Sequence, residues 1–200
     1  MRYIKRNKRM YENKIMKRYL RRLYDMEVQP IRSKDEIARM KQSLHGRDLL
    51  LFTIGINTNL RISDILPLAR EDFDGDHLRV KEKKTGKYRL IRINESVRKA
   101  IEELAPASGI LFPSRKGDKP ISTTQAYRRL TEAAERAGLP YNFGTHSMRK
   151  TWAYHAYNNG KGAPLSDIQK ALNHGSQRET LRYIGIVQET LDNLFDSVNL

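Results

Sequence analysis

Two short segments of the sequence carry residues suited to phosphate chemistry. In the first, His146 and Arg149 stand three residues apart at the start of an expected helix, where free backbone N–H groups favour an anion. Arginine offers a planar charged fork to two phosphate oxygens, and histidine exchanges a proton near neutral pH. The pair therefore suits a scissile phosphate, although a salt-bridged helix start is the ordinary explanation when it is taken alone.

The second segment places Tyr183 nine residues after His174. His174 falls in a tight bend, because one expected helix ends near Gly175 and the next opens with a capping box, Ser176 to Glu179. An isolated tyrosine at such a helical position is by default half-buried core. Its chemical interpretation therefore depends on its spacing from His174.

The composition favours a polyanionic partner. Lys and Arg number 38 against 23 Asp and Glu, a net charge of +15. Nucleic acid is the first candidate and an anionic membrane surface the second. The absence of cysteine excludes disulfides, thiolate nucleophiles and cysteine-zinc sites. No apolar run approaches a signal peptide or a membrane span, so we expect a soluble, cytoplasmic protein.

The elements that must position these residues fall into two parts. Residues 1–30 form a basic arm, whose first 25 residues hold ten Lys or Arg, and residues 31–200 form one folded domain. The arm carries an apolar stripe at helical spacing. It therefore fits a helix that docks on its own domain, contacts DNA or lies on a membrane surface. Pro30 places the boundary near residues 28–31.

The domain is predicted to be α+β and mainly helical, with one small antiparallel sheet. Alternation at Leu78 and Val80, a turn at Lys84–Gly86 and the apolar run Leu90–Ile93 predict a β-hairpin with a basic tip. Periodicity and capping signals predict helices from Ser33 to Leu44, and over 48–57, 94–104, 122–137, 145–159, 166–172, 176–184 and 187–198. The segments near 106–109 and 115–120 are expected to be loops.

These segments resemble the boxes of the tyrosine recombinase (phage integrase) family. The matching residues are Asn59-Leu60-Arg61-Ile62-Ser63-Asp64, His146-x-x-Arg149, and Leu172-Asn173-His174 followed by Tyr183. The lysine that this family carries on a β-hairpin falls within residues 83–87, where Lys84 is the better match and Lys83 and Lys87 are alternatives. The resemblance covers residues 31–200 and implies the catalytic-domain fold of that family.

The resemblance also implies a reaction. Tyr183 would attack DNA and become joined to it through a 3′-phosphotyrosine, without metal, cofactor or ATP. A phenol is a poor nucleophile at neutral pH, so its site must favour the phenolate. Arg61 and Arg149 would bind the non-bridging phosphate oxygens and neutralise the charge of the transition state.

The remaining roles are implied in the same way. Lys84 would protonate the departing 5′ oxygen, His146 would exchange the proton of the tyrosine, and His174 would donate a hydrogen bond to the phosphate. Asp64, three residues after Arg61, would orient that guanidinium or a nearby histidine, the alternative being an ordinary surface ion pair. Neither the cysteine content nor the histidine spacing indicates a metal site.

The sequence departs from the family pattern in three places. Asn59 and Asn173 stand where glycine is usual, and asparagine tolerates left-handed backbone better than most residues. The helical domain that normally closes the clamp on DNA has no counterpart in the basic arm, so we expect help from the arm or from an accessory DNA-binding protein.

The expected partners are double-stranded DNA and further copies of the chain. A homo-tetramer would form on paired sites through the C-terminal helix, residues 187–198. Candidate DNA-binding residues are Lys83, Lys87, Arg21 and Arg22. Two other functions are compatible with parts of the sequence. A type IB topoisomerase shares the chemistry, and a non-catalytic helix-turn-helix over 145–172 would leave Arg61, Lys84 and Tyr183 unexplained.

Overall fold

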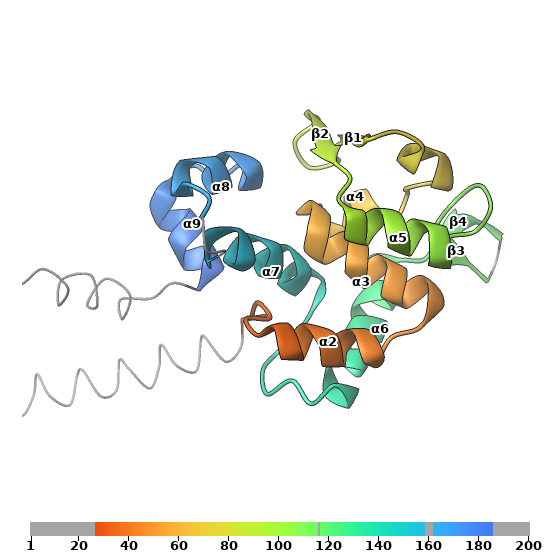
Figure 1. Ribbon diagram of the computed structural model, residues 1–200, viewed down its shortest axis with the longest axis horizontal. Coiled ribbons are helices and arrows are strands. Elements are labelled where there is room, and N and C mark those ends of the chain that lie inside the picture. Colours follow the sequence, from red (N-terminus) through yellow and green to blue (C-terminus); the bar gives the residue numbers. More distant parts are fainter. Residues whose placement is uncertain (1–26, 116, 159–161, 186–200) are drawn as a thin grey trace, which may run out of the picture.

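The computed structural model describes residues 27–115, 117–158 and 162–185. These residues are mostly helical and carry two small antiparallel sheets (Figure 1). The predicted mainly helical α+β class is confirmed. Residues 1–26 of the predicted basic arm, with Arg21 and Arg22, and the predicted helix over 187–198 lie outside the described residues. No helix in the described part of the chain combines the length and apolarity needed to cross a membrane.

The first described helix, α2 (Lys34–Gln42), begins where its capping signal predicted. The hydroxyl of Ser33 accepts the N–H of Asp35 at 3.1 Å. Glu36, in the first turn of this helix, accepts a hydrogen bond from the hydroxyl of Tyr141 at 3.0 Å. That carboxylate therefore ties α2 to the loop after α6.

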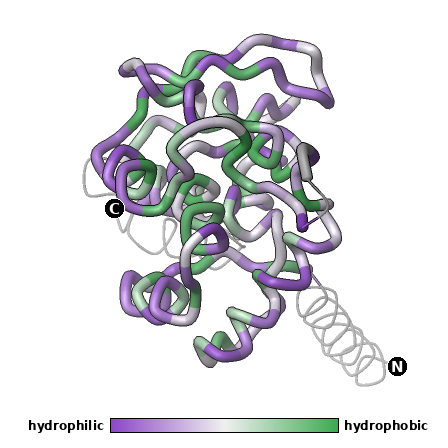
Figure 2. The backbone as a smooth tube through the Cα atoms, turned by 90° about the vertical axis from the view of Figure 1, so that its right-hand side faces the viewer, coloured by the Kyte–Doolittle hydropathy of each residue, from purple (hydrophilic) through white to green (hydrophobic). Residues whose placement is uncertain are grey.

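Helix α3 (Gly46–Thr58) runs through the larger hydrophobic core, as its apolar sequence predicted. Leu50, Phe52 and Ile54 have no solvent exposure. Where α3 meets α7, a methyl group on Gly55 would overlap the side chain of Met148. The glycine thus lets the two helices approach closely. Figure 2 shows hydrophobic segments gathered in the interior of the molecule and hydrophilic ones at its margins.

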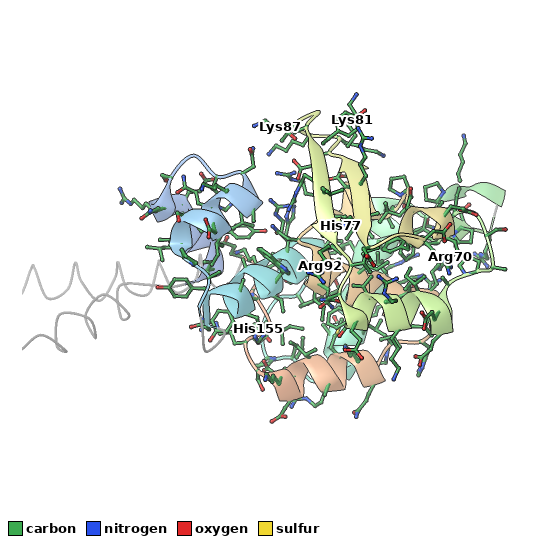
Figure 3. All side chains as sticks on the ribbon, turned by 45° about the horizontal axis from the view of Figure 1, so that its top comes forward. Arg70, His77, Lys81, Lys87, Arg92 and His155 are labelled. Carbon is green, nitrogen blue, oxygen red and sulfur yellow. The ribbon has the colours of Figure 1, made fainter. Side chains whose placement is uncertain are left out.

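The predicted β-hairpin is present. Strand β1 (His77–Lys81) pairs antiparallel with β2 (Tyr88–Arg92), and the register sets Lys81 opposite Tyr88. Leu78 and Val80 point into the core, while alternate residues face solvent. The hairpin projects from the helices, with Lys81 and Lys87 toward its tip (Figure 3).

A second hairpin was missed. Strands β3 (Pro113–Ser114) and β4 (Gly117–Pro120) pair where the sequence predicted a loop over 115–120. The strands are too short, and too rich in Pro and Gly, to show a period of two. The short helix α4 (Ile62–Ile65) and the 3₁₀ turn η1 (Arg70–Phe73) also escaped prediction, because neither completes two helical turns.

The next two helices begin at predicted caps. Asn94 accepts the N–H of Val97 at 3.0 Å to open α5 (Glu95–Leu104). Ser122 and Gln125 form a capping box at the start of α6 (Thr123–Arg136).

Helix α7 (Thr145–Asn158) joins two hydrophobic clusters. Its Met148 belongs to the larger core, whereas Ala153 belongs to a smaller one formed with α8 (Leu165–Leu172) and α9 (Gln177–Ile184). Figure 1 shows α8 and α9 to one side of the other elements, at the end of α7. The first turns of α7 therefore lie at the junction of the two clusters, where most of the sequence boxes meet.

Candidate active site

Two asparagines in left-handed conformation end the helices that frame the site. Asn59 follows α3 with φ of 57°, and Asn173 follows α8 with φ of 55°. Among the described residues, these are the non-glycine residues with positive φ. The asparagines therefore keep the turns that the family forms with glycine, as expected. The amide of Asn59 also donates to the carbonyl of Ala171 at 2.9 Å, which links one turn to the other.

Arg149 is held between these two turns. Its Nη1 donates to the carbonyl of Asn59 at 2.6 Å and its Nη2 to the carbonyl of Leu172 at 2.7 Å. The residue is only 3% exposed, and this desolvation lowers the pKa of Arg149 from its ordinary value. Main-chain carbonyls that cannot move independently thus fix the guanidinium before any substrate binds.

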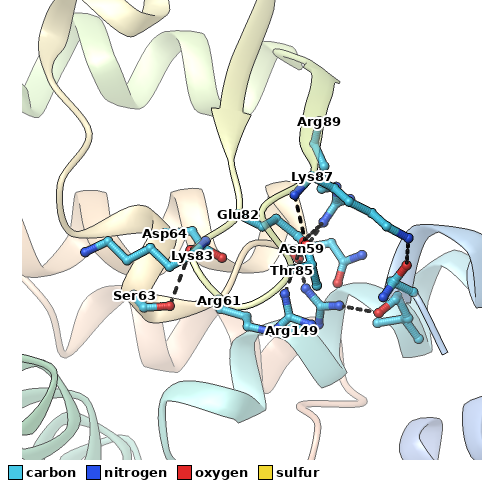
Figure 4. A network of polar contacts seen from close by, with 12 residues as sticks. Asn59, Arg61, Ser63, Asp64, Glu82, Lys83, Thr85, Lys87, Arg89 and Arg149 are labelled. Atoms are coloured by element: carbon cyan, nitrogen blue, oxygen red, sulfur yellow. Dashed lines mark hydrogen bonds and ion pairs between the residues drawn. The ribbon is translucent and has the colours of Figure 1, made fainter.

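Arg61 immediately precedes α4 and lies next to a carboxylate that the sequence did not point to. Its Nη1 is 3.2 Å from Oε1 of Glu82, and Arg89 reaches the same oxygen at 3.2 Å (Figure 4). Burial opposes ionisation of Glu82, but the hydroxyl of Thr85 and the two arginines outweigh it and lower the pKa of Glu82. The Nη1 of Arg61 is nevertheless buried and makes no hydrogen bond of good geometry within the described part of the chain.

The signal for Glu82 was present in the strand pattern. It follows Leu78 and Val80 at a spacing of two, so the pleat places all three on the buried side of the hairpin. A carboxylate buried at the edge of a basic turn needs cationic partners, and Arg61 and Arg89 supply them.

Asp64 makes a contact different from the one expected. Its Oδ1 accepts the backbone N–H of Lys83 at 3.0 Å, and the residue is 2% exposed. Glu82 therefore takes the place expected of Asp64 beside Arg61. Asp64 instead fixes the start of the hairpin turn, which is neither of the two expected roles.

The three lysines of the hairpin turn differ in their surroundings. Lys84 is exposed, and its positive charge adds to the desolvation and the arginine charges that lower the pKa of His146. Lys87 extends to the α8–α9 bend, where its Nζ donates to Oδ1 of Asn173 at 3.2 Å. Lys83 is anchored through its backbone. Lys83 and Lys87 therefore have contacts elsewhere, and Lys84 stays the candidate that the resemblance implies.

His146 lies on the first turn of α7. Its ring reaches the surface, but surrounding protein atoms desolvate it, and this lowers its pKa. The positive charges of Arg149, Lys150 and Arg61 lower it further. The imidazole is therefore neutral at neutral pH and able to accept a proton.

Tyr183 projects from α9 toward the two arginines. Its hydroxyl is buried and makes no hydrogen bond of good geometry with the described residues. Burial raises the pKa of Tyr183 to about 12, and the charges of Arg149 and Arg61 oppose that rise. His174 meets the phenol ring edge to face, with ring centroids 5.0 Å apart. A phenol oxygen, two guanidinium groups and two imidazoles are thus gathered at one place.

Arg61 and Arg149 are cations next to the phenol, and the carboxylate of Glu82 pairs with Arg61. In the described ranges, no three His, Asp or Glu side chains are placed to hold a metal ion. The groups that converge can bind an anion, exchange a proton and attack as a nucleophile; they are Arg61, Lys84, His146, Arg149, His174 and Tyr183.

The sequence of the chain matches one family model over almost its whole length. Residues 5–189 match the phage integrase family. The chain belongs to this family. It is therefore an integrase or recombinase of the tyrosine recombinase type, a class of enzymes that exchange DNA strands.

Individual relatives agree with this assignment. The chain is 47% identical over 170 residues to the probable integrase/recombinase YoeC of Bacillus subtilis (strain 168), covering 82% of this chain and 92% of that protein. The crystal structure of XerA recombinase matches with a TM-score of 0.67 at 20% identity, over 86% of this chain and 64% of that one. A lambda integrase tetramer bound to a Holliday junction matches with a TM-score of 0.62 at 19% identity, over 78% of this chain and 48% of that one.

Proposed function

We propose that this recombinase cuts and rejoins double-stranded DNA through a 3′-phosphotyrosyl bond at Tyr183. The observation that carries the proposal is the buried hydroxyl of Tyr183, which lies in the field of Arg149 and Arg61 and next to the ring of His174. Arg149 and Arg61 oppose the rise in pKa that burial imposes on the phenol of Tyr183, and the same cations would stabilise the pentavalent phosphate once DNA is bound.

In the proposed step, the oxygen of Tyr183 forms a bond to phosphorus while the bond to the 5′ oxygen breaks. The phenol proton passes to the neutral imidazole of His146, and Lys84 protonates the departing 5′ oxygen. Arg149 and Arg61 hold the non-bridging oxygens, so the step requires no metal ion. Attack by the 5′ hydroxyl of another strand reverses the reaction and completes strand exchange without ATP.

Glu82 and Asp64 support these groups without touching the phosphate. Glu82 fixes Arg61 through an ion pair, and Asp64 holds the backbone from which Lys84 extends. Both are positioning residues in this proposal.

The proposed partners are duplex DNA and three further copies of the chain. A lambda integrase of the same fold has been crystallised as a tetramer on a Holliday junction. We extend this to a tetramer on paired sites, assembled through residues 187–198, in the cytoplasm where the DNA lies. The basic residues 1–30 or an accessory protein would supply the rest of the grip on DNA, and Lys83 and Lys87 would contribute to it from the hairpin.

One experiment tests the chemistry and its outcome together. The full chain is incubated, with a metal chelator, with nicked duplexes prepared from the DNA flanking its own gene. The proposal expects a covalent protein-DNA adduct that leaves a free 5′ hydroxyl, followed by joining to a second duplex. A 5′-linked adduct would contradict it, and relaxation of a plasmid that lacks any such site would favour a topoisomerase instead.

A further inference from the structure

Lys150 is a buried cation beside the nucleophile that the reaction above does not use. It follows Arg149 on α7 and is 4% exposed. Its Nζ lies 5.4 Å from the centroid of the Tyr183 ring, within the range of a cation-π contact.

The same ammonium group is bound by a carboxylate from the segment that precedes α2. Nζ of Lys150 lies 2.7 Å from Oε1 of Glu27, whose side chain is half-exposed. Glu27 opens a short segment, residues 27–31, that is fastened to α7 at further points. The N–H of Ile31 donates to the hydroxyl of Thr151 at 2.9 Å, and the ring of His155 hydrogen-bonds the carbonyl of Ile31 at 3.0 Å.

We propose that Lys150 and Glu27 are opposed positioning residues for the nucleophile, Lys150 promoting ionisation of Tyr183 and Glu27 restraining it. The proposal rests on the function proposed above, because it concerns the reactivity of Tyr183. It makes the segment 27–31, which follows the basic N-terminal residues, a regulator of the cleavage step.

The electrostatics of the phenol ring explain the role of Lys150. When the phenol loses its proton, negative charge spreads into the ring, and a cation near the ring becomes more favourable. A lysine held at that distance therefore stabilises the phenolate more than the phenol. It also fixes the ring, since a buried ammonium tied to Glu27 has little freedom to move.

Glu27 acts in the opposite direction. Its negative charge raises the pKa of Tyr183, whereas Arg149 and Arg61 lower it. The charged and titratable groups that face Tyr183 come from four elements: Arg149 and Lys150 from α7, Arg61 from the turn before α4, His174 from the α8–α9 bend, and Glu27 from the segment 27–31. Among these groups, Glu27 supplies the negative charge, and it is also the ion-pair partner of Lys150.

Opposite effects of the two partners separate this proposal from a purely structural ion pair. If the pair served only to hold the segment on α7, then removing either partner would impair the enzyme in the same direction. If the proposal holds, Lys150→Met slows adduct formation and Glu27→Gln accelerates it.

The test measures single-turnover formation of the covalent adduct by the full chain on the nicked duplexes described above, at saturating DNA. Binding of each variant to the same duplex is measured separately. We expect Lys150→Met to form the adduct about tenfold more slowly, with unchanged affinity. Lys150→Arg, which keeps the charge, should restore most of the rate. Glu27→Gln should raise the rate and should shift the pH profile of adduct formation to lower pH.

Two controls make each outcome decisive. Lys170→Met removes an exposed lysine from α8 and should leave the rate unchanged. Tyr183→Phe should form no adduct. Equal slowing by Lys150→Met and Glu27→Gln, or no change in either, would overturn the proposal while leaving the function intact. An adduct formed by Tyr183→Phe would instead contradict the proposed function itself.

Discussion

The hydroxyl of Thr180 binds the ring of His174 and determines which nitrogen carries the proton. Nδ1 of His174 lies 3.2 Å from Oγ1 of Thr180, and the same hydroxyl donates to the carbonyl of Ser176 at 3.1 Å. A hydroxyl has one proton to donate, and Thr180 gives it to the carbonyl of Ser176. The hydroxyl oxygen must therefore accept from His174, so the hydrogen-bond network assigns a proton to Nδ1. His174 can then donate a hydrogen bond to a phosphate from its other nitrogen only as an imidazolium.

DNA binding should therefore be coupled to proton uptake. Desolvation, assisted by Arg149 and Arg61, holds the pKa of His174 below its ordinary 6.5 in the free protein, so the ring is neutral at pH 7. A bound phosphate favours the imidazolium and raises that pKa, so affinity should fall as pH rises through neutrality. Calorimetric titrations in buffers of different ionisation enthalpy measure the protons taken up. His174→Gln should lose this uptake, and an unchanged uptake would refute the assignment.

Glu82→Gln tests the carboxylate that the sequence analysis missed. The change removes the ion pairs to Arg61 and Arg89, so we expect the free energy of unfolding to fall by about 2 kcal/mol. This loss is smaller than that for breaking a fully buried ion pair, because both arginines are partly exposed. Adduct formation should slow as well, since Arg61 loses its anchor. The matched control is Glu103→Gln, at an exposed pair on α5, which should change neither property.

The stabilisation by Glu82 should depend on pH in a defined direction. Its pKa is lowered by folding from an ordinary 4.5, so the unfolded chain binds this proton more readily than the folded one. The contribution is therefore complete above pH 4.5 and is lost as pH falls toward the lowered pKa. Melting temperatures of the native protein and Glu82→Gln should converge in acid, and a constant difference would contradict the ion-pair account.

Asn59 should tolerate glycine better than alanine. Its left-handed backbone costs an alanine about 1–2 kcal/mol, whereas glycine adopts it freely. Asn59→Gly loses the amide contact to Ala171 but keeps the carbonyl that binds Arg149. Denaturant titration and adduct formation should both rank glycine above alanine, and the reverse order would show that the amide matters more than the turn.

Lys84 should be the lysine that protonates the leaving group. Lys84→Met should slow cleavage of ordinary DNA by about 10²–10⁴-fold, the range of general acid catalysis. A duplex with sulfur in place of the 5′ bridging oxygen needs no such proton, so it should be cleaved at a nearly native rate by this variant. Lys83→Met and Lys87→Met are the controls. If the sulfur-containing duplex restored cleavage to Lys83→Met or Lys87→Met and not to Lys84→Met, the general acid would be that other lysine.

Much of the fold could be predicted because its signals are local. The caps at Ser33, Asn94 and Ser122 begin helices where side-chain oxygens meet free N–H groups. The alternation about Leu78 and Val80 likewise predicted the hairpin. The second hairpin over 113–120 was missed, because strands of two and four residues that contain Pro and Gly show no measurable period.

The members proposed for the site came from the resemblance, whereas the residues that support them were not predicted. The resemblance indicated residues far apart in the chain, such as Arg61 and Tyr183. In the structure, the positive charge of Arg61 acts to lower the pKa of Tyr183. Glu82 and Lys150 escaped notice because their roles depend on partners distant in sequence, Arg61 and Glu27. Contacts of that kind arise from tertiary packing, which a periodic pattern does not encode.

The most direct measurement is to identify the residue that carries DNA. The chain has ten tyrosines, several of them on α7 and α9. The adduct formed on a nicked duplex is digested with protease and nuclease, and the peptide that retains a nucleotide is sequenced by mass spectrometry. The account predicts a single modified peptide with the nucleotide on Tyr183, absent from Tyr183→Phe. A nucleotide on any other residue, or an adduct that persists in Tyr183→Phe, would contradict it.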